Sequence, residues 1–124
     1  MKTTFTRALI IDSPWIDYIL DGSKTWEMRT RATKLRGRIG LIRKGSGLIV
    51  GEVTLVDSLP AQPREQLLAT TSYHRMAPAD IRSGAVARWR CPWVLKDVKR
   101  YIKPIPYEHP QGAVIWVDLS KALP

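Results

Sequence analysis

The pattern of hydrophobic and polar residues predicts strands interrupted by short helices. Residues 5–11 (FTRALII) end in an unbroken apolar run, which favours a strand in the centre of a sheet. Gly51 lies inside another long apolar stretch and indicates a bulge or a close backbone approach. The sequence Gly45-Ser46-Gly47 predicts a tight hairpin turn. Further strands are predicted at residues 25–29, 37–43, 48–59, 89–101 and 112–119, with residues 103–106 kept extended by prolines.

Helix signals appear at three places. Ser13 is a predicted N-terminal cap, and Pro14 suits the first helical position, so a short helix is expected to follow. Its apolar face would contain Trp15, Tyr18 and Ile19, and Asp21-Gly22 would end it. Two more short helices are predicted at residues 64–69 and 78–84, with residues 73–76 in the loop between them.

Several antiparallel strands with two or three short helices indicate a small α+β fold. A closed or nearly closed β-barrel is the favoured arrangement, because closure removes unpaired strand edges. A plain open sheet backed by helices is the alternative. The length of 124 residues fits one domain over residues 1–124.

Charge sets this sequence apart. Twenty lysines and arginines against eleven acids give a net charge of +9 and a pI of about 10.1. Such a balance favours anionic partners such as RNA or nucleotides, although a basic, solvated surface is the alternative. Residues 24–44 and 88–103 hold most of the basic residues, and together they would line a groove if they met on one side.

Composition also excludes several classes of protein. A single cysteine, Cys91, rules out an internal disulfide framework, and only two histidines argue against a metal site. No apolar run approaches about 18 residues, and the N-terminus lacks the apolar core of a signal peptide. We therefore expect a cytoplasmic protein with no cofactor, no metal and no obligate protein partner.

Candidate chemistry is concentrated in residues 22–29 (GSKTWEMR). If residues 25–29 form a strand, Trp26 and Met28 point into a core, and the polar side chains share the other face. Desolvation would let Lys24 lose its proton near neutral pH and act as a base. The alternative is that Glu27 and Arg29 are only a structural ion pair, with Lys24 facing solvent.

The spacing Gly22-x-Lys24-x-x-Glu27-x-Arg29 resembles the GxKxxExR signature of the ASCH family, a branch of the PUA-like β-barrel superfamily. The order of the other predicted strands is also similar to that family, so the resemblance covers essentially the whole chain. It implies a cleft beside the motif and a link to RNA or modified nucleosides. Some small bacterial members remove acyl groups from N4-acylcytidines such as N4-acetylcytidine. Others are described as ribonucleases or nucleic-acid-binding modules.

In the amidohydrolase branch the motif lysine is catalytic, which implies that role for Lys24. The position of Glu27 can hold a threonine nucleophile in that branch, and this sequence has no hydroxyl there. Instead, Glu27 or Lys24 would activate a water, or Thr25 would attack after losing its proton to Lys24. Arg29 or a backbone amide would hold the oxyanion, a contact typically worth about 3 kcal/mol.

The expected function is therefore hydrolysis of the N4-acyl group of a cytidine or cytosine, with an RNA-binding module or a single-strand ribonuclease as the alternative. The sequence does not distinguish between different acyl groups, or between a free nucleoside and RNA as the substrate. Lys24, Glu27 and Thr25 are the expected catalytic residues. The expected substrate-binding residues are Ser13, Trp15, Arg29, Glu52, Tyr107 and His109.

Overall fold

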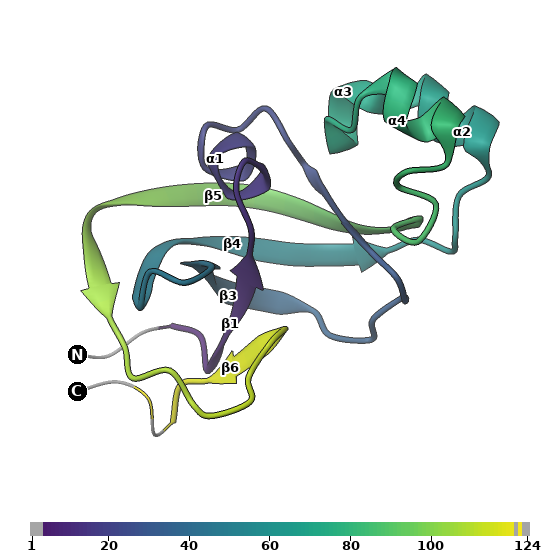
Figure 1. The fold of residues 1–124 in the computed structure, drawn as a ribbon. Coiled ribbons are helices and arrows are strands. Elements are labelled where there is room, and N and C mark those ends of the chain that lie inside the picture. Colours follow the sequence, from purple (N-terminus) through teal and green to yellow (C-terminus); the bar gives the residue numbers. More distant parts are fainter. Residues whose placement is uncertain (1–3, 121, 123–124) are drawn as a thin grey trace.

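A computed structural model describes residues 4–120 and 122 of the chain. Within these described residues, six strands form one mixed sheet, and four short helices accompany it (Figure 1). The elements are β1 (Arg7–Ile11), α1 (Trp15–Leu20), β2 (Trp26–Arg29), β3 (Gly37–Arg43), β4 (Leu48–Ser58), α2 (Arg64–Ala69), α3 (Thr71–His74), α4 (Pro78–Ser83), β5 (Cys91–Pro106) and β6 (Trp116–Asp118).

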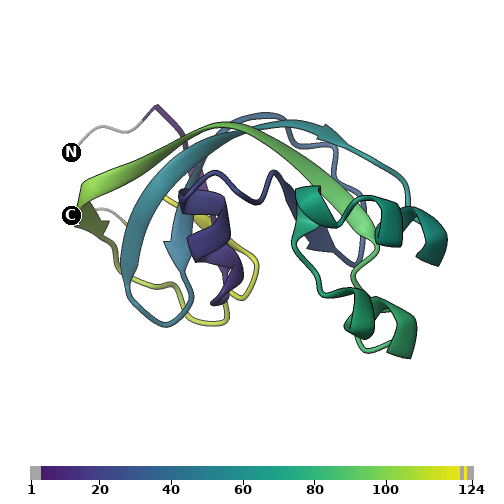
Figure 2. The ribbon, with the colours of Figure 1, turned by 90° about the horizontal axis from the view of Figure 1, so that it is seen from above.

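The strand order is β2-β5-β4-β3-β1-β6. All neighbouring strands are antiparallel except β1 and β3, which run parallel. Because β1 pairs with β3 on one side and β6 on the other, it lies inside the sheet as expected. The sheet curves strongly, and α1 lies on its concave side (Figure 2). This half-barrel confirms the predicted α+β fold with a small, mostly antiparallel barrel, although there are four helices rather than two or three.

Two corrections concern the helices. Ser13 does not cap α1, whose N-cap residue is Pro14 and which has no side-chain cap. Backbone carbonyls take that role, because Asp12 accepts from the amide of Ile16 and Pro14 accepts from the amides of Asp17 and Tyr18. Residues 73–76 are not simply a loop, because Tyr73 and His74 belong to α3. The turn after α2 carries the chain directly into this extra helical turn.

The last strand is shorter than expected. β6 spans Trp116–Asp118, whereas residues 112–119 were predicted as a strand. Gly112 has φ +81°, and the amide of Ala113 donates to the carbonyl of Pro110, so the chain turns here instead of extending. The long β5, in contrast, continues through the prolines at its end.

Buried side chains form a main core on the concave side of the sheet and two smaller clusters. Ile16 and Ile19 of α1 pack there with Leu41 and Leu55. Gly51 permits the close approach of backbones that the sequence predicts, because a Cβ there would lie 2.6 Å from the carbonyl oxygen of Lys99. The register of β4 against β5 also shifts beside Gly51, which fits a bulge.

The helices α2, α3 and α4 gather at one end of the molecule (Figure 1). Leu67 of α2, Ile81 of α4 and Met76 of the turn between α3 and α4 form a cluster with Met28 of β2. Trp26 packs against this cluster and stacks on Tyr73, with ring centroids 5.0 Å apart. The predicted alternation of β2 is therefore confirmed for Trp26 and Met28. In the described part of the chain no helix is long and apolar enough to cross a membrane.

Candidate active site

The turn between α1 and β2 brings the motif lysine back into contact with the helix. Gly22, with φ +84°, follows the C-cap of α1, and its amide donates to the carbonyl of Ile19. The amide of Lys24 then donates to the carbonyl of Tyr18 at 2.9 Å. From there β2 runs antiparallel to β5, with Glu27 opposite Trp93. A helix end and a strand pairing thus fix the backbone on both sides of Lys24.

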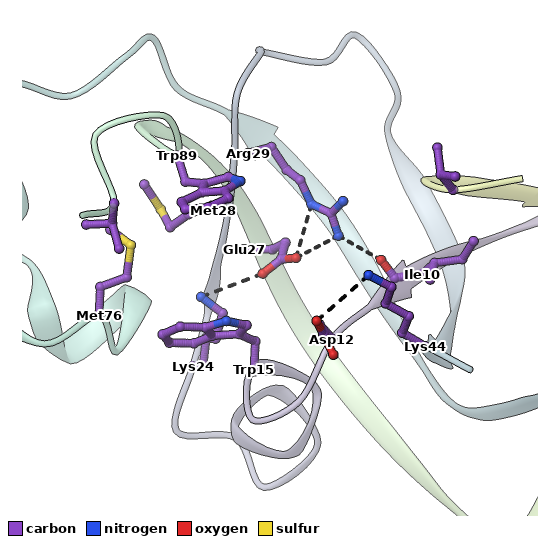
Figure 3. A pocket seen from close by; sticks show the side chains of 12 residues that line it. Ile10, Asp12, Trp15, Lys24, Glu27, Met28, Arg29, Lys44, Met76 and Trp89 are labelled. Carbon is purple, nitrogen blue, oxygen red and sulfur yellow. Dashed lines mark hydrogen bonds and ion pairs between the residues drawn. The ribbon is translucent and has the colours of Figure 1, made fainter. Parts of the chain in front are cut away.

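A pocket of about 360 Å³ opens beside this motif (Figure 3). It collects side chains from the β1–α1 turn, β2, the turn after β3 and the α3 to β5 region. The lining residues are Ile10, Asp12, Trp15, Lys24, Glu27, Met28, Arg29, Lys44, Met76, Val86, Trp89 and Val114. Lys24, Glu27, Arg29 and Trp15 were expected at the site, and the fold brings these four together.

Lys24 is buried, with 3% of its surface exposed. Its Nζ donates to the carbonyls of Trp26 at 2.6 Å and His74 at 2.8 Å, and lies 3.7 Å from Oε1 of Glu27. Burial lowers the pKa of Lys24 to about 8. Glu27 opposes this shift, whereas the positive charge of Arg29 adds to it. The ammonium is therefore a much stronger acid than that of an exposed lysine.

Arg29 holds one oxygen of Glu27 in place. Its Nε and Nη2 donate to Oε2 of Glu27 at 3.1 and 2.7 Å, and Nη2 also donates to the carbonyl of Ile10 at 2.9 Å. The guanidinium lies over the ring of Trp93, 5.6 Å from its centroid. Glu27 itself is buried. Its other oxygen, Oε1, is the one that lies near Nζ of Lys24. Arg29 thus orients the carboxylate through Oε2, and Lys24 lies close to Oε1.

Two tryptophans give the pocket flat apolar surfaces. The ring of Trp15 lies 5.1 Å from Nζ of Lys24, measured to its centroid. Trp89 is 41% exposed although it lines the same pocket, and the guanidinium of Arg88 lies over its ring, 5.9 Å from the centroid. Asp12 and Lys44 form an exposed ion pair at 3.9 Å that also lines the pocket. Such a pocket suits a flat, partly polar ligand.

His74 supports Lys24 through its backbone carbonyl. Its ring is fully buried, with Nε2 2.8 Å from the carbonyl oxygen of Leu67 and Nδ1 accepting from the amide of Met76 at 2.9 Å. Because a carbonyl can only accept, Nε2 carries a proton. Because Nδ1 accepts from an amide, it carries none, and the ring is neutral. Burial lowers the pKa of His74 and the charge of Lys24 adds to this effect. The ring bonds fix the carbonyl that receives Lys24.

Thr25 and Ser13 do not line this pocket. Thr25 is exposed, and its backbone pairs with Tyr73 on one side and Leu95 on the other. Ser13 is exposed too, and its Oγ accepts from Nη1 of Arg43 at 3.5 Å. Arg43 is itself paired with Asp17. Neither hydroxyl therefore meets Lys24 and Glu27 in the structure.

Glu52 lies in a separate network on the sheet. It accepts from Nε of Arg38 at 2.6 Å and from the hydroxyl of Tyr101 at 2.9 Å. Burial acts to raise the pKa of Glu52, but these two hydrogen bonds, together with the positive charges of Arg38 and Lys99, leave the pKa below its ordinary value. Glu52 is therefore a well-paired carboxylate outside the pocket.

Tyr107 and His109 form a third network. The hydroxyl of Tyr107 lies 2.7 Å from Nδ1 of His109, and Nε2 of His109 lies 2.9 Å from the carbonyl oxygen of Ala113. Neither side chain lines the pocket. They instead brace the loop that carries Val114, which does line it. Tyr107 and His109 therefore do not form the cleft wall themselves, but support the loop that contributes to it.

The pocket also contains residues that were not among the expected catalytic and substrate-binding residues: Ile10, Asp12, Met28, Lys44, Met76, Val86, Trp89 and Val114. Met28 was expected only in the core, yet it reaches both the helical cluster and the pocket. Trp89 follows a basic residue, which is a weak signal for a stacking role. No three His, Cys, Asp or Glu side chains come together as metal ligands within residues 4–120 and 122.

Comparison with known proteins identifies the family. A family model for the ASCH domain matches residues 9–106. Three solved structures of ZmASCH from Zymomonas mobilis are similar in fold, one of ASCH itself and two of mutant proteins. One mutant is 17% identical with a TM-score of 0.62, covering 81% of this chain and 74% of that one. ASCH itself is 16% identical with a TM-score of 0.58, covering 80% and 69%.

The other mutant protein is 18% identical, with a TM-score of 0.65 and coverage of 93% and 88%. At such identities these structures support the fold, and they agree with the half-barrel described above. No curated protein matches the sequence. The family model spans most of the chain, including the whole lysine, glutamate and arginine motif. The chain therefore belongs to the ASCH domain family, with a PUA-like fold.

Proposed function

We propose that this protein is an amidohydrolase that removes the acyl group from N4-acylated cytidine or cytosine. The observation that carries the proposal is the buried Lys24, whose pKa is lowered to about 8, facing the carboxylate of Glu27 at 3.7 Å. An ammonium of lowered pKa and a carboxylate held at this distance suit a reaction in which one group takes a proton and another gives one.

The substrate base would lie against the tryptophans. The pocket volume of about 360 Å³ falls in the range of small-molecule sites, and both Trp15 and Trp89 line it. A pyrimidine has two flat faces that stack on such rings. The acyl group would then extend toward Lys24 and Glu27, which are buried at the inner side of the pocket.

In the proposed reaction Oε1 of Glu27 takes a proton from water, and the water oxygen bonds to the acyl carbon. The bond from that carbon to N4 then breaks, while Lys24 gives a proton to N4. The products are cytidine and a carboxylic acid. The proton on Glu27 passes back to Lys24, which restores both groups. Two N–H bonds of Lys24 are directed to carbonyl oxygens, so the third is the one that moves.

Arg29 would stabilise the oxyanion of the tetrahedral intermediate. Its Nε and Nη2 are occupied by Glu27 and Ile10, whereas Nη1 has no hydrogen-bond partner among the described residues. A donor aimed at such an oxyanion typically contributes about 3 kcal/mol to the transition state. A route through Thr25 receives no support from the geometry, because its side chain does not line the pocket.

The test is a panel of N4-acylated cytidines and cytosines incubated with the purified protein, with release of the free amine followed by chromatography. We expect turnover of at least one acyl compound without added metal. Lys24→Ala should abolish it while the far-UV circular dichroism spectrum stays unchanged. Absence of turnover on the whole panel would overturn the proposal.

An RNA-binding module or single-strand ribonuclease is the second candidate, favoured by the net charge of +9. It predicts affinity for RNA that falls with salt as phosphate contacts release counterions. Arg36 and Arg38, within the basic stretch of residues 24–44, already pair with Asp57 and Glu52. Cleavage of single-stranded RNA that disappears in Lys24→Ala would favour the ribonuclease over the amidohydrolase.

A further inference from the structure

A second cavity, of about 250 Å³, lies at the helical end of the molecule. It is bounded by α2, the end of α4 and the segment that leads into β5. Its apolar part consists of Leu67, Ile81 and Val86, and three arginines line it as well. The complete set is Arg64, Leu67, Ile81, Arg82, Ser83, Gly84, Val86, Ala87 and Arg90.

The positive charge of this cavity is not balanced by acids. Arg64, Arg82 and Arg90 form no ion pair with any carboxylate in the part of the chain that the structure describes. The acids of the same helices, Glu65 and Asp80, do not line the cavity. Three guanidinium groups without a carboxylate partner around one cavity create a positive potential that attracts an anion.

Two of these arginines are held in place by neutral partners. Nη2 of Arg64 donates to the carbonyl of Arg82 at 2.9 Å, and Nε of Arg90 donates to the carbonyl of Gln62 at 3.0 Å. Each guanidinium has five N–H groups, so several remain for a ligand. The planar fork of arginine fits the oxygens of a phosphate, and prior fixation reduces the entropy lost on binding.

The cavity lies next to the candidate active site. Val86 lines both hollows, Trp89 lines the active-site pocket, and Arg90 lines the second cavity. The segment 86–90 is therefore the wall between them. In a nucleotide the base and the phosphate are joined through one sugar, so a base stacked on Trp89 brings its phosphates close to this wall.

We propose that the arginine cavity, lined by Arg64, Arg82 and Arg90, is a phosphate-binding subsite for the substrate. The protein would then act on a phosphorylated form of the modified cytidine, a mononucleotide or a residue within an RNA strand, in preference to the free nucleoside. The identity of the base rests on the function proposed above. Binding of the phosphate does not depend on it.

The kinetic test compares N4-acetylcytidine with its 3′- and 5′-monophosphates and with a short RNA that carries one such residue. Arg82→Gln is the cleanest variant, because no hydrogen bond from this side chain is lost. We expect kcat/KM to be at least about tenfold higher for a phosphorylated substrate than for the nucleoside. Arg82→Gln should reduce this advantage without changing kcat/KM for the nucleoside.

The mononucleotide and RNA arms identify the source of the phosphate. An advantage for the monophosphates alone assigns the subsite to nucleotides, and a further gain with the oligonucleotide assigns it to RNA. Equal kcat/KM for all four substrates in the wild type would overturn the proposal. So would an advantage that survives in the triple variant R64Q/R82Q/R90Q.

A binding measurement keeps the test independent of catalysis. Fluorescence anisotropy of a labelled ten-nucleotide RNA is recorded over a range of salt concentrations for the wild type and R64Q/R82Q/R90Q. The slope of log K against log salt should become shallower by about 0.7 for each phosphate contact that is lost. The matched control K96Q/K99Q/R100Q removes three exposed charges from β5 and should change the slope less.

The two measurements separate the failure of each proposal. Absence of turnover on every substrate, together with a slope change specific to R64Q/R82Q/R90Q, overturns the amidohydrolase and supports the subsite. Turnover with identical slopes for both triple variants overturns the subsite and leaves the amidohydrolase standing. Thermal unfolding of each variant, with a cooperative transition as in the wild type, establishes that the changes arise in folded protein.

Discussion

Both side-chain hydrogen bonds from Arg29 to Glu27 end on the same carboxylate oxygen, Oε2, at 3.1 and 2.7 Å. The other oxygen, Oε1, lies 3.7 Å from Nζ of Lys24. Arg29 therefore fixes the direction of the carboxylate and leaves one oxygen for proton transfer. A structural ion pair alone would not require a buried lysine beside it.

Replacement of Arg29 by lysine tests this orientation. Arg29→Lys keeps the positive charge but loses the two-pronged contact with Glu27, because an ammonium has no planar fork. We expect kcat/KM for N4-acetylcytidine to fall by about 100-fold, since misplacement of a reacting group by about 1 Å has that effect. Arg31→Lys, an exposed neighbour, is the control and should retain activity. Wild-type kcat/KM in Arg29→Lys would contradict the orienting role.

The buried charge of Lys24 predicts a rise of stability with pH. Its pKa is about 8 in the folded protein, below the ordinary value of 10.5 that applies to the unfolded chain. Between these values the unfolded chain binds more protons, so the free energy of unfolding increases as pH rises from about 8 to 10.5. The gain from this site is at most roughly 3 kcal/mol.

Urea denaturation of the wild type and Lys24→Met between pH 7 and 10.5 measures this effect. Other groups titrate in the same range, so the informative quantity is the difference between the two proteins. The wild type should gain stability relative to Lys24→Met as pH rises. Lys34→Met, an exposed lysine, should give a curve parallel to that of the wild type. Parallel curves for Lys24→Met as well would mean that Lys24 titrates normally.

Tyr107 and His109 are predicted to contribute to stability and not to the chemical step. Tyr107→Phe removes the hydroxyl that lies 2.7 Å from Nδ1 of His109. The free energy of unfolding should decrease by about 1 kcal/mol, the usual contribution of one hydrogen bond. Because neither residue lines the pocket, kcat should change by less than about threefold. A large loss of kcat with normal stability would place this pair in the reaction.

Gly51 and Gly40 form a matched pair for backbone packing. A Cβ at residue 51 would lie 2.6 Å from the backbone carbonyl of Lys99, which cannot move without breaking the β4–β5 pairing. At residue 40 the nearest atom, at 2.7 Å, belongs to the side chain of Phe5. Gly51→Ala should therefore destabilise the protein by about 3 kcal/mol and Gly40→Ala by less, as measured by thermal unfolding. Equal costs would show that the β5 backbone yields as easily as a side chain.

The sequence predicts most of the sheet because local patterns determine it. The boundaries of β3 and α2 agree with the predicted ranges, and alternation in β2 correctly assigns Trp26 and Met28 to an apolar cluster. The predicted range of the last strand is wrong because a turn around Gly112 competes with the β-forming residues that follow. The motif Lys24, Glu27 and Arg29 comes together because one strand and the turn before it carry all three.

The rest of the pocket depends on contacts between residues far apart in the chain. His74 supplies a carbonyl to Lys24 across fifty positions, through an α3 turn that the sequence pattern does not reveal. Trp89 reaches the pocket from the segment before β5. Glu52 was expected at the site, but Arg38 and Tyr101 engage it from other strands. His109 was expected there too, and its partners Tyr107 and Ala113 are near neighbours in the chain.

The most direct test of the proposed chemistry is the pH dependence of kcat/KM for N4-acetylcytidine in the wild type and in Lys24→Gln. If Lys24 is the acid that protonates N4, wild-type activity falls as pH rises above about 8, where Lys24 loses its proton. Lys24→Gln should be slower by at least about 100-fold and should lack this limb. Activity in Lys24→Gln equal to that of the wild type, with the same pH profile, would contradict the account.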